Sequence, residues 1–215
     1  MLKADFHIHT HCSRCSDMKP RDIIKNALTK KYDVLGIVDH DSIKGALTTK
    51  KVAGKKILII PGEEIKTVHG EIIVLLSDGK YNKNLLDICD RAKDENHFIV
   101  APHPFDYLRK GVKNNIVKVK KLDALEIFNS RVLVNRFNLI ARDYAEKNKI
   151  PKIVGSDAHF IEEIGNAAVF LDCEKNIDSI FDYLIKNDNL KFYCKRCSII
   201  PHLKSNIVLP FKRIF

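Results

Sequence analysis

The sequence predicts an α/β protein in which parallel strands alternate with helices and close into a (β/α) barrel. Short apolar segments, suited to buried strands, alternate along the chain with longer segments whose apolar residues recur at helical spacing. Histidines and carboxylates stand at or just after many of the apolar segments, and active sites of parallel barrels form at the carboxyl ends of the strands. The 215 residues are enough for one sizeable domain, and 45% of them are apolar, which excludes a disordered chain.

Seven or eight strands are predicted, from segments that are short, apolar and bounded by turn residues. In chain order these segments are Lys3–His7, Asp33–Val38, Lys56–Ile60, Glu71–Leu76, Phe98–Ala101, Ala124–Phe128, Lys152–Val154 and Ala167–Leu171. A tight connection through His69 and Gly70 joins the third segment to the fourth.

Five helices are predicted, because apolar residues recur along one face of each segment. They span Arg21–Lys31, Ile43–Val52, Leu85–Asn96, Val132–Asn148 and Ile177–Lys186. Pro20 stands near the start of the first helix, where its fixed backbone angle is suitable. Ser42 is the predicted N-cap of the second helix.

The barrel domain is predicted to span residues 1–190, followed by a C-terminal extension over residues 191–215. Pro201 and Pro210 interrupt the extension, which is expected either to pack against the barrel or to form an interaction tail. No apolar run approaches the roughly 18 residues needed to span a bilayer. The N-terminus lacks the basic-then-apolar order of a signal peptide, so we expect a cytoplasmic protein with no membrane partner.

The charge of the chain is strongly positive. Lys and Arg number 37 against 27 for Asp and Glu, which gives a formal net charge of +10. A basic balance favours polyanionic partners, either nucleic acid or a phosphorylated small molecule. The alternative is a Lys-rich solvated surface, because the excess is spread along the chain.

Six cysteines include two C-x-x-C pairs, Cys12 with Cys15 and Cys194 with Cys197. A zinc site made of all four thiolates would require the two ends of the chain to meet. Ordinary reduced thiols are the favoured interpretation, because disulfides are rare in the cytoplasm.

The candidate metal ligands share one position, at or just after a predicted strand. They are His7, His9, His40, Glu63, Glu64, His103, Glu126, Asn129, Asp157 and His159. His7 and His9 lie two residues apart on an extended segment, so both imidazoles point to the same side. Mixed nitrogen and oxygen ligands suit Zn, Mn or Fe ions better than Ca, and there are enough of them for two or three ions. Such ions activate water and stabilise charge on a phosphoryl group, so hydrolysis is the predicted chemistry.

Five short motifs contain most of these residues. They are Asp5-Phe6-His7-Ile8-His9-Thr10, Val38-Asp39-His40-Asp41, Pro61-Gly62-Glu63-Glu64, Ala101-Pro102-His103-Pro104 and Gly155-Ser156-Asp157-Ala158-His159. In this order, over about residues 3–172, they resemble the motifs of the PHP (polymerase and histidinol phosphatase) superfamily. The resemblance implies a distorted seven-stranded, TIM-like (β/α) barrel, a trinuclear metal centre at the C-terminal ends of the strands, and phosphoesterase activity.

The resemblance also implies which residues bind each ion. The first ion would be bound by His7, His9, Glu64 and Asp157. His103 would bind the second ion, with Glu64 bridging, and His40 and His159 would bind the third. Glu64 and Asp157 would hold the centre together during catalysis.

Two ligand positions near Glu64 have competing candidates. Glu64 is preferred to Glu63 as the bridging ligand, because it follows Gly62 by two residues as in the family. Beyond it, Glu71 aligns better with the family's next ligand, whereas His69 is the chemically more usual residue. If neither binds, the centre would be binuclear.

The loop after His9 is expected to supply one more ligand. Asp17 is the preferred residue, and His11 and Cys15 are the alternatives. This loop is longer than is usual in the family.

Further residues have expected roles around the centre. Asp5 and Asp39 are expected to orient imidazoles, or simply to end their strands. The substrate phosphate would be held by Arg131, beside Asn129, or by Arg14. His97 and His202 are assigned to structure.

The predicted function is a metal-dependent phosphoesterase in which a metal-activated hydroxide attacks the phosphorus of a phosphate ester. The basic charge and the long first loop, which is similar to that of archaeal nuclease-like members, favour a nucleotide or nucleic acid as substrate. The alternatives are a histidinol-phosphatase-like enzyme of small metabolites, and a non-catalytic nucleic-acid-binding PHP subunit. An amidohydrolase is a further alternative, but it usually needs a strand-end Lys, for which the sequence has no obvious candidate.

Overall fold

The computed structural model of the chain describes residues 1–119 and 121–205. Its strands are β1 (Leu2–Ile8), β2 (Val34–His40), β3 (Leu58–Thr67), β4 (Gly70–Leu75), β5 (Phe98–Ala101), β6 (Ala124–Asn129), β7 (Lys152–Gly155), β8 (Ala167–Leu171) and β9 (Lys191–Cys194). These nine strands form one sheet in the order β7-β6-β5-β4-β3-β2-β1-β8-β9. The expectation of seven strands was wrong, because β8 and β9 extend the sheet beyond β1 in antiparallel fashion.

The sheet is mixed, so the expectation of a wholly parallel barrel was also wrong. The pairs β1–β2, β2–β3, β5–β6 and β6–β7 are parallel. Strand β4 runs antiparallel to both β3 and β5. Only Val68 and His69 separate β3 from β4, and two residues can make a hairpin but not the long crossover of a parallel pair. Because β4 is antiparallel to both of its neighbours, the strands on its two sides run in the same direction. These strands are β1, β2, β3, β5, β6 and β7.

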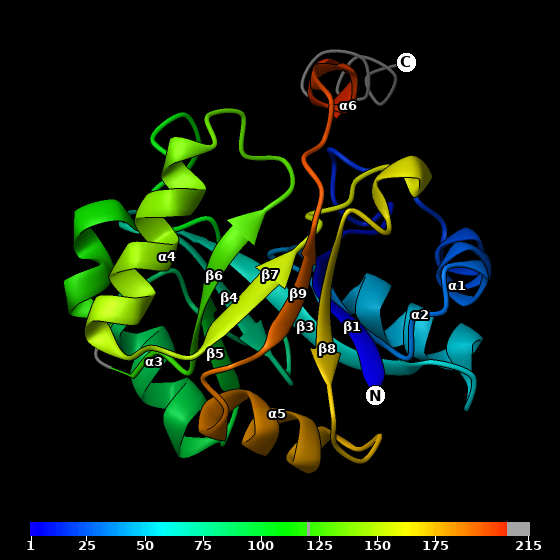
Figure 1. Cartoon of the computed structure of the whole chain (residues 1–215), viewed down its shortest axis with the longest axis horizontal. Helices are drawn as coiled ribbons and strands as arrows, with labels where there is room; N and C mark the ends of the chain where they lie inside the picture. The colour runs from blue at the N-terminus through cyan, green and yellow to red at the C-terminus, as the bar shows by residue number, and fades with distance from the viewer. Residues whose placement is uncertain (120, 206–215) are drawn as a thin grey trace.

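The sheet curls until its first and last parallel strands nearly meet (Figure 1). An isolated parallel bridge joins Ile8, at the end of β1, to Ala158, just beyond β7. The amide of His9 donates to the carbonyl of Ala158 at 3.0 Å. The barrel is therefore nearly closed, and the carboxyl ends of six strands converge at one end of it.

Helices cover the outside of the sheet. They are α1 (Pro20–Thr29), α2 (Lys44–Ala53), α3 (Leu85–Asp94), α4 (Arg136–Asn148), α5 (Ile177–Lys186) and the short α6 (Ile199–Leu203), with 3₁₀ turns η1 (Lys113–Lys118) and η2 (Ile161–Glu163). In Figure 1, α3 and α4 lie on one side of the sheet and α1 and α2 on the other.

The starts of the helices follow capping chemistry in part. Pro20 is the first residue of α1, as its fixed backbone angle allows. The side chain of Asn84 caps α3 and that of Asn176 caps α5. The prediction for α2 was wrong: the N-cap is Ile43, which has no side-chain oxygen, and Ser42 lies one residue before it.

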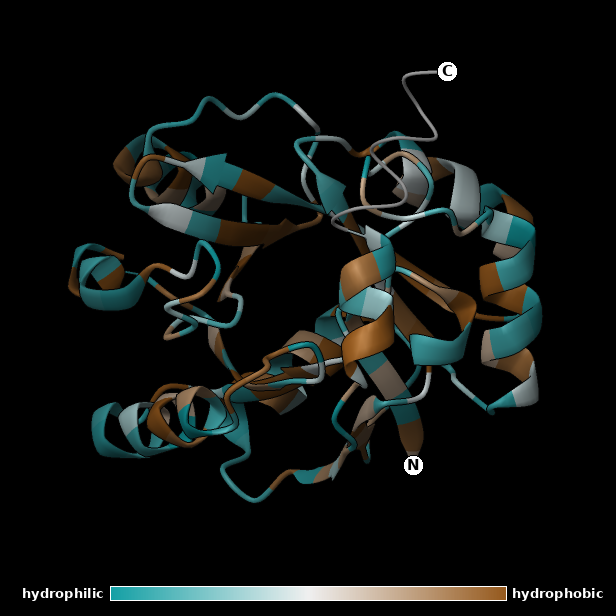
Figure 2. Cartoon of the chain, turned by 90° about the horizontal axis from the view of Figure 1, so that it is seen from above, coloured by the Kyte–Doolittle hydropathy of each residue, from teal (hydrophilic) through white to brown (hydrophobic). Residues whose placement is uncertain are grey.

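The core lies between the curled sheet and these helices. Phe6, Ile60 and Leu75 are buried within it, and Ile23 and Ile24 bury the inner face of α1. Figure 2 shows the helices alternating between hydrophobic and hydrophilic residues along their length, as helices with one buried face do. Packing of both sheet faces fixes the positions of the strand ends.

The described part of the C-terminal extension packs against the barrel. Strand β9 pairs antiparallel with β8 from Ala167 opposite Cys194 to Phe170 opposite Lys191. Residues 195–205 then continue to α6, beyond the carboxyl ends of the strands (Figure 1). Pro210 lies outside the described residues. Among the described residues, no helix is long and apolar enough to cross a membrane.

Candidate metal centre

Five histidines and three carboxylates meet at the end of the barrel where the strands converge. Strand β1 carries His7 and leads to His9, which follows it directly. Their Nε2 atoms lie 3.2 Å apart. The Nε2 of His7 is 3.4 Å from Asp157 Oδ1 and 3.7 Å from Glu64 Oε2, and the Nε2 of His9 is 3.3 and 3.4 Å from the same two atoms. All four residues are buried.

These four atoms fit a metal ion. Ligands bound to Zn²⁺ at 2.0–2.2 Å in a tetrahedron lie about 3.3–3.6 Å from one another. The five distances above run from 3.2 to 3.7 Å. Two imidazole nitrogens and two carboxylate oxygens are also the donor set that Zn, Mn and Fe ions accept.

Glu64 presents its two oxygens to different neighbours. Its Oε2 faces His7 and His9 and lies 3.0 Å from His40 Nδ1, whereas its Oε1 lies 3.1 Å from His103 Nε2. One carboxylate therefore stands between two groups of nitrogen ligands. This is the arrangement that a carboxylate bridging two ions requires.

Strand alternation explains why Glu64 and not Glu63 faces the centre. Adjacent residues of a strand point to opposite faces of the sheet. Glu63 accepts a hydrogen bond from the hydroxyl of Ser77, on the other face. The preference for Glu64 thus agrees with where the two side chains lie.

The same alternation places Glu71 at the centre. In the β3–β4 hairpin Lys66 pairs with Glu71 and Glu64 pairs with Ile73, so Glu64 and Glu71 are diagonal neighbours on one face. Glu71 Oε2 lies 3.8 Å from His103 Nε2. His69, the other candidate, lies at the tip of the hairpin and lines a separate surface pocket.

A third group of ligands lies beside the first. Ring nitrogens of His9, His40 and His159 lie within 4.8 Å of one another. The Sγ of Cys15 is 3.1 Å from His159 Nε2. Asp17, the preferred ligand from this loop, is exposed and does not line the cavity, which Cys15 does.

A second layer of residues orients the ligands. Glu126 accepts from His7 Nδ1 at 2.9 Å and from the backbone amide of His103 at 2.7 Å. Ser13 lies 3.2 Å from His9 Nδ1 and donates to Asp39 at 2.6 Å. Such partners fix the ring orientation of metal-binding histidines.

The two carboxylates expected to orient imidazoles, Asp39 and Asp5, accept hydrogen bonds from backbone amides. Asp39 accepts from the amide of Thr10 at 2.7 Å, which holds the first loop in place. Asp5 accepts from the amides of His7 and Ser156 at 3.2 and 3.1 Å, so it ties β1 to the loop after β7.

The pKa shifts of Asp157 and His159 suit metal binding, whereas that of His7 favours a proton that a metal ion would have to displace. Burial raises the pKa of the Asp157 carboxyl, but His7 and Arg109 bring that pKa well below its usual value. Burial lowers the pKa of His7, but the surrounding carboxylates, led by Asp157, raise it well above the usual value. Burial, together with His9, lowers the pKa of His159 well below the usual value. Ionised carboxylates and neutral imidazoles are the forms that bind metal ions.

The centre opens into a cavity of about 260 Å³ with a basic wall. Arg109 donates to Asp157 and, at 3.0 Å, to Asn129 Oδ1, and it lines the cavity beside Lys110 and Lys66. Sequence reasoning missed Arg109. The feature of the sequence that could have identified Arg109 is its position in the loop that follows β5 and His103.

The two predicted phosphate-binding arginines lie differently. Arg131 lines the cavity but is buried, and its Nη1 donates to both oxygens of Glu163 at 2.8 Å. Arg14 is exposed and does not line the cavity. His97 bonds to Tyr81 away from the centre, whereas His202 lines the cavity.

The chain matches known proteins along most of its length. A family model described as PHP-associated matches residues 135–189. An uncharacterized protein of Methanocaldococcus jannaschii, MJ0417, is 36% identical over 176 residues, which are 78% of this chain and 70% of the relative. The chain belongs to the PHP superfamily. A second relative from the same organism, the uncharacterized protein MJ1587, is 32% identical over 142 residues, which are 60% of this chain and 82% of the relative.

Solved structures share the fold of this PHP protein. PsfC from Pseudomonas syringae PB-5123 aligns over 98% of both chains with a TM-score of 0.71 and 16% identity. A Bifidobacterium adolescentis protein, described as a proposed metal-dependent phosphoesterase, aligns over 86% of this chain and 96% of its own, with a TM-score of 0.63 and 13% identity. An amidohydrolase from Chromobacterium violaceum, with bound sulfate and no metal, aligns over 73% of this chain and 87% of its own, with a TM-score of 0.59 and 12% identity.

Proposed function

We propose that this PHP protein is a metal-dependent phosphoesterase that hydrolyses a phosphate ester of a nucleotide or of a nucleic acid end. The observation that carries the proposal is the position of Glu64 between the imidazoles of His40 and His103, in a cavity that is also lined by Arg109, Lys110 and Lys66. The names of the Bifidobacterium and Chromobacterium proteins place hydrolases on the same fold.

The residues of this chain would hold two or three divalent ions. His7, His9, Asp157 and Glu64 would bind the first ion, and Glu64 would share the second with His103 and Glu71. His40 and His159 would bind the third. Divalent ions in such a centre lower the pKa of water and offset charge on phosphoryl oxygens.

We infer that Cys15, rather than Asp17, completes the third site. Its sulfur already lies beside His159, and a Cys–His–His set favours Zn²⁺ over the harder Mn²⁺. The Asp17 carboxylate, in contrast, is exposed to solvent.

Arg109 is the residue best placed to hold the substrate. Its guanidinium is held by Asp106 through Nε at 2.8 Å and by Asn129 through Nη2 at 3.0 Å, so it reaches the cavity in a fixed orientation. Its Nη1 also donates to Asp157, so two of the five guanidinium N–H groups remain for phosphoryl oxygens. Arg109 would therefore bind the phosphoryl group and stabilise negative charge that develops on it during attack.

A non-catalytic nucleic-acid-binding subunit is the weaker proposal, because that role does not require the nearly complete set of metal ligands. An amidohydrolase is also a weaker proposal, because Glu64, and not a modified lysine, lies between the ligand groups; Lys66 and Lys110 line the cavity, where they could bind phosphate.

The test is turnover of a substrate panel by protein loaded with Zn²⁺ or Mn²⁺. The panel holds nucleoside monophosphates, 5′-phosphorylated oligonucleotides, a phosphodiester, histidinol phosphate and a simple amide. The proposal predicts release of phosphate from the nucleotide or oligonucleotide arm and its loss in Glu64→Gln. Turnover of the amide alone, or of no compound, would refute the proposal.

A further inference from the structure

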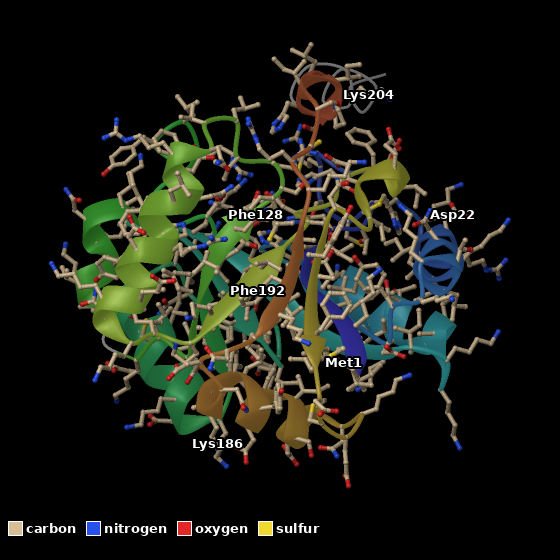
Figure 3. All side chains as sticks on the ribbon, in the orientation of Figure 1. Met1, Asp22, Phe128, Lys186, Phe192 and Lys204 are labelled. Carbon is tan, nitrogen blue, oxygen red and sulfur yellow. The ribbon has the colours of Figure 1, made fainter. Side chains whose placement is uncertain are left out.

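Residues 195–205, called the C-terminal segment below, reach the metal cavity, which His202 and Ser205 help to line. After β9 the amide of Lys195 donates to Asn166 at 2.7 Å, and the amide of Cys197 donates to Ser130 at 2.8 Å. The segment therefore crosses from β8 to the loop after β6 before α6 begins. Figure 3 labels Lys204, directly after α6, at the end of the barrel opposite the one marked by Met1 and Lys186.

Arg131 fastens this segment to the barrel. While its Nη1 pairs with Glu163 of η2, its Nη2 donates to the hydroxyl of Ser205 at 2.6 Å. Ser205 in turn donates to the carbonyl of His202 at 3.1 Å. Arg131, Glu163 and Ser205 are all buried, so the connection is protected from water. Arg131 thus holds α6 in position and is not free to grip a phosphate.

His202 is the residue that this anchor places at the cavity. Its side chain is buried, with the residue 8% exposed, and it lines the cavity together with Arg109, Asp157 and His159. Its Nε2 is buried and has no hydrogen-bond partner among the described residues. A buried polar atom without a partner destabilises a folded protein, so the Nε2 of His202 calls for a partner from outside the chain, either a water molecule or a bound ligand.

Two arginines, Arg131 and Arg109, and two carboxylates, Asp157 and Asp106, act on the charge of His202. Burial lowers the pKa of His202 to about 4, and the positive charges of Arg131 and Arg109 contribute in the same direction. The imidazole is therefore neutral near pH 7, with a hydrogen on one nitrogen. Phosphoryl oxygens only accept hydrogen bonds, so the tautomer with the hydrogen on Nε2 would donate to them.

We propose that the C-terminal segment is a fixed wall of the active site and that His202 binds the substrate by donating from Nε2 to a phosphoryl oxygen. This inference rests on the proposed phosphoesterase function. The cavity of about 260 Å³ is smaller than the roughly 300–1,000 Å³ of most small-molecule sites, so it would hold the phosphate and the atoms nearest to it. The substrate class is therefore a terminal phosphate monoester, whose remaining part lies outside the wall.

The test is calorimetric titration of the zinc-loaded full chain with inorganic phosphate. His202→Ala should weaken phosphate binding by about 10- to 100-fold, the value of one hydrogen bond to a charged group, with the bound zinc unchanged. Lys204→Ala, in the same segment but exposed, should bind phosphate like the wild type. Ser205→Ala keeps His202 but removes one of its anchors, and it should show a smaller loss.

The steady-state constants give a second readout that folding alone would not change. His202→Ala should raise the KM for a phosphate monoester, whereas a phosphodiester should be a poor substrate of both proteins. Equal phosphate affinity in His202→Ala and wild type, or no phosphate binding by the loaded wild type, would overturn the inference.

The two proposals can fail separately. If Glu64→Gln abolishes turnover while His202→Ala changes neither phosphate affinity nor KM, the phosphoesterase proposal is supported and the proposed role of His202 is refuted. If phosphate binding depends on His202 but no phosphate ester is hydrolysed, the proposed contact between His202 and phosphate is supported and the phosphoesterase proposal is refuted.

Discussion

Replacing Glu64 by Gln should remove two ions at once, and Glu63→Gln is a control that differs by one residue. The Glu64 oxygens face separate ligand groups, with Oε2 3.0 Å from His40 and Oε1 3.1 Å from His103. An amide keeps the shape but loses the negative charge and one of the two acceptors. Loss of an outer partner of a metal ligand already costs about 10- to 100-fold in affinity, so loss of a shared ligand should cost at least about 100-fold for each ion. That is ~2.7 kcal/mol for each of two ions.

The assay is metal content after dialysis, with competitive titration against a chelating dye for affinity. Glu63→Gln keeps its contact with Ser77 on the opposite face and should bind metal like the wild type. The reasoning would be refuted if both variants lost metal equally, or if Glu64→Gln kept its full metal content.

Three other predictions follow from the same geometry. Cys15→Ser should abolish the thiolate-to-cobalt charge-transfer absorption of the Co²⁺-loaded protein, whereas Cys12→Ser should keep it; equal spectra would exclude Cys15 as a ligand. Gly155→Ala would place a Cβ 2.1 Å from Glu126 Oε1, so it should destabilise the fold by about 1–3 kcal/mol in denaturant unfolding and weaken metal binding; wild-type values would contradict this contact. Burial lowers the pKa of His202 to about 4 in the folded protein, whereas the unfolded chain has the usual value of about 6.5. The unfolded chain therefore binds the proton more readily, and the free energy of unfolding should decrease as the pH falls from about 6.5 towards 4. Thermal unfolding of the metal-free protein at pH 7.5 and 5 should show a smaller drop for His202→Gln than for wild type, and an equal drop would contradict the buried neutral ring.

The sequence predicted best where side-chain direction follows from a regular strand. His7 lies on β1 and His9 follows the strand directly, and Glu64 lies on β3. The predicted directions of these side chains depend only on strand alternation, and the structure agrees with them. The bounds of β5 and β8 were predicted to the residue, because a polar residue or a proline stands directly beyond each end of these short apolar runs.

Residues in loops were harder to place. Whether Cys15 or Asp17 faces the centre depends on how the first loop turns, and that loop is shaped by contacts with Asp39, far away in the sequence. Arg109 lies in a long loop, and its partners come from elsewhere in the chain: Asn129 ends β6 and Asp157 lies in the loop after β7. No local pattern encodes such contacts.

The topology of the sheet edge was also beyond local reasoning. Strand β9 is mostly exposed and has no apolar alternation, so only its pairing with β8 defines it. The contacts of Arg131 could not be predicted for a related reason: its partners Glu163 and Ser205 lie far apart in the sequence and meet only in the folded chain.

Anomalous diffraction from crystals of the zinc-loaded protein tests the central claim most directly. We expect one ion between His7, His9, Asp157 and Glu64, and a second within about 2.0–2.2 Å of the other Glu64 oxygen and of His103. Zinc peaks only at other positions, or a protein that takes up no divalent ion, would contradict the account.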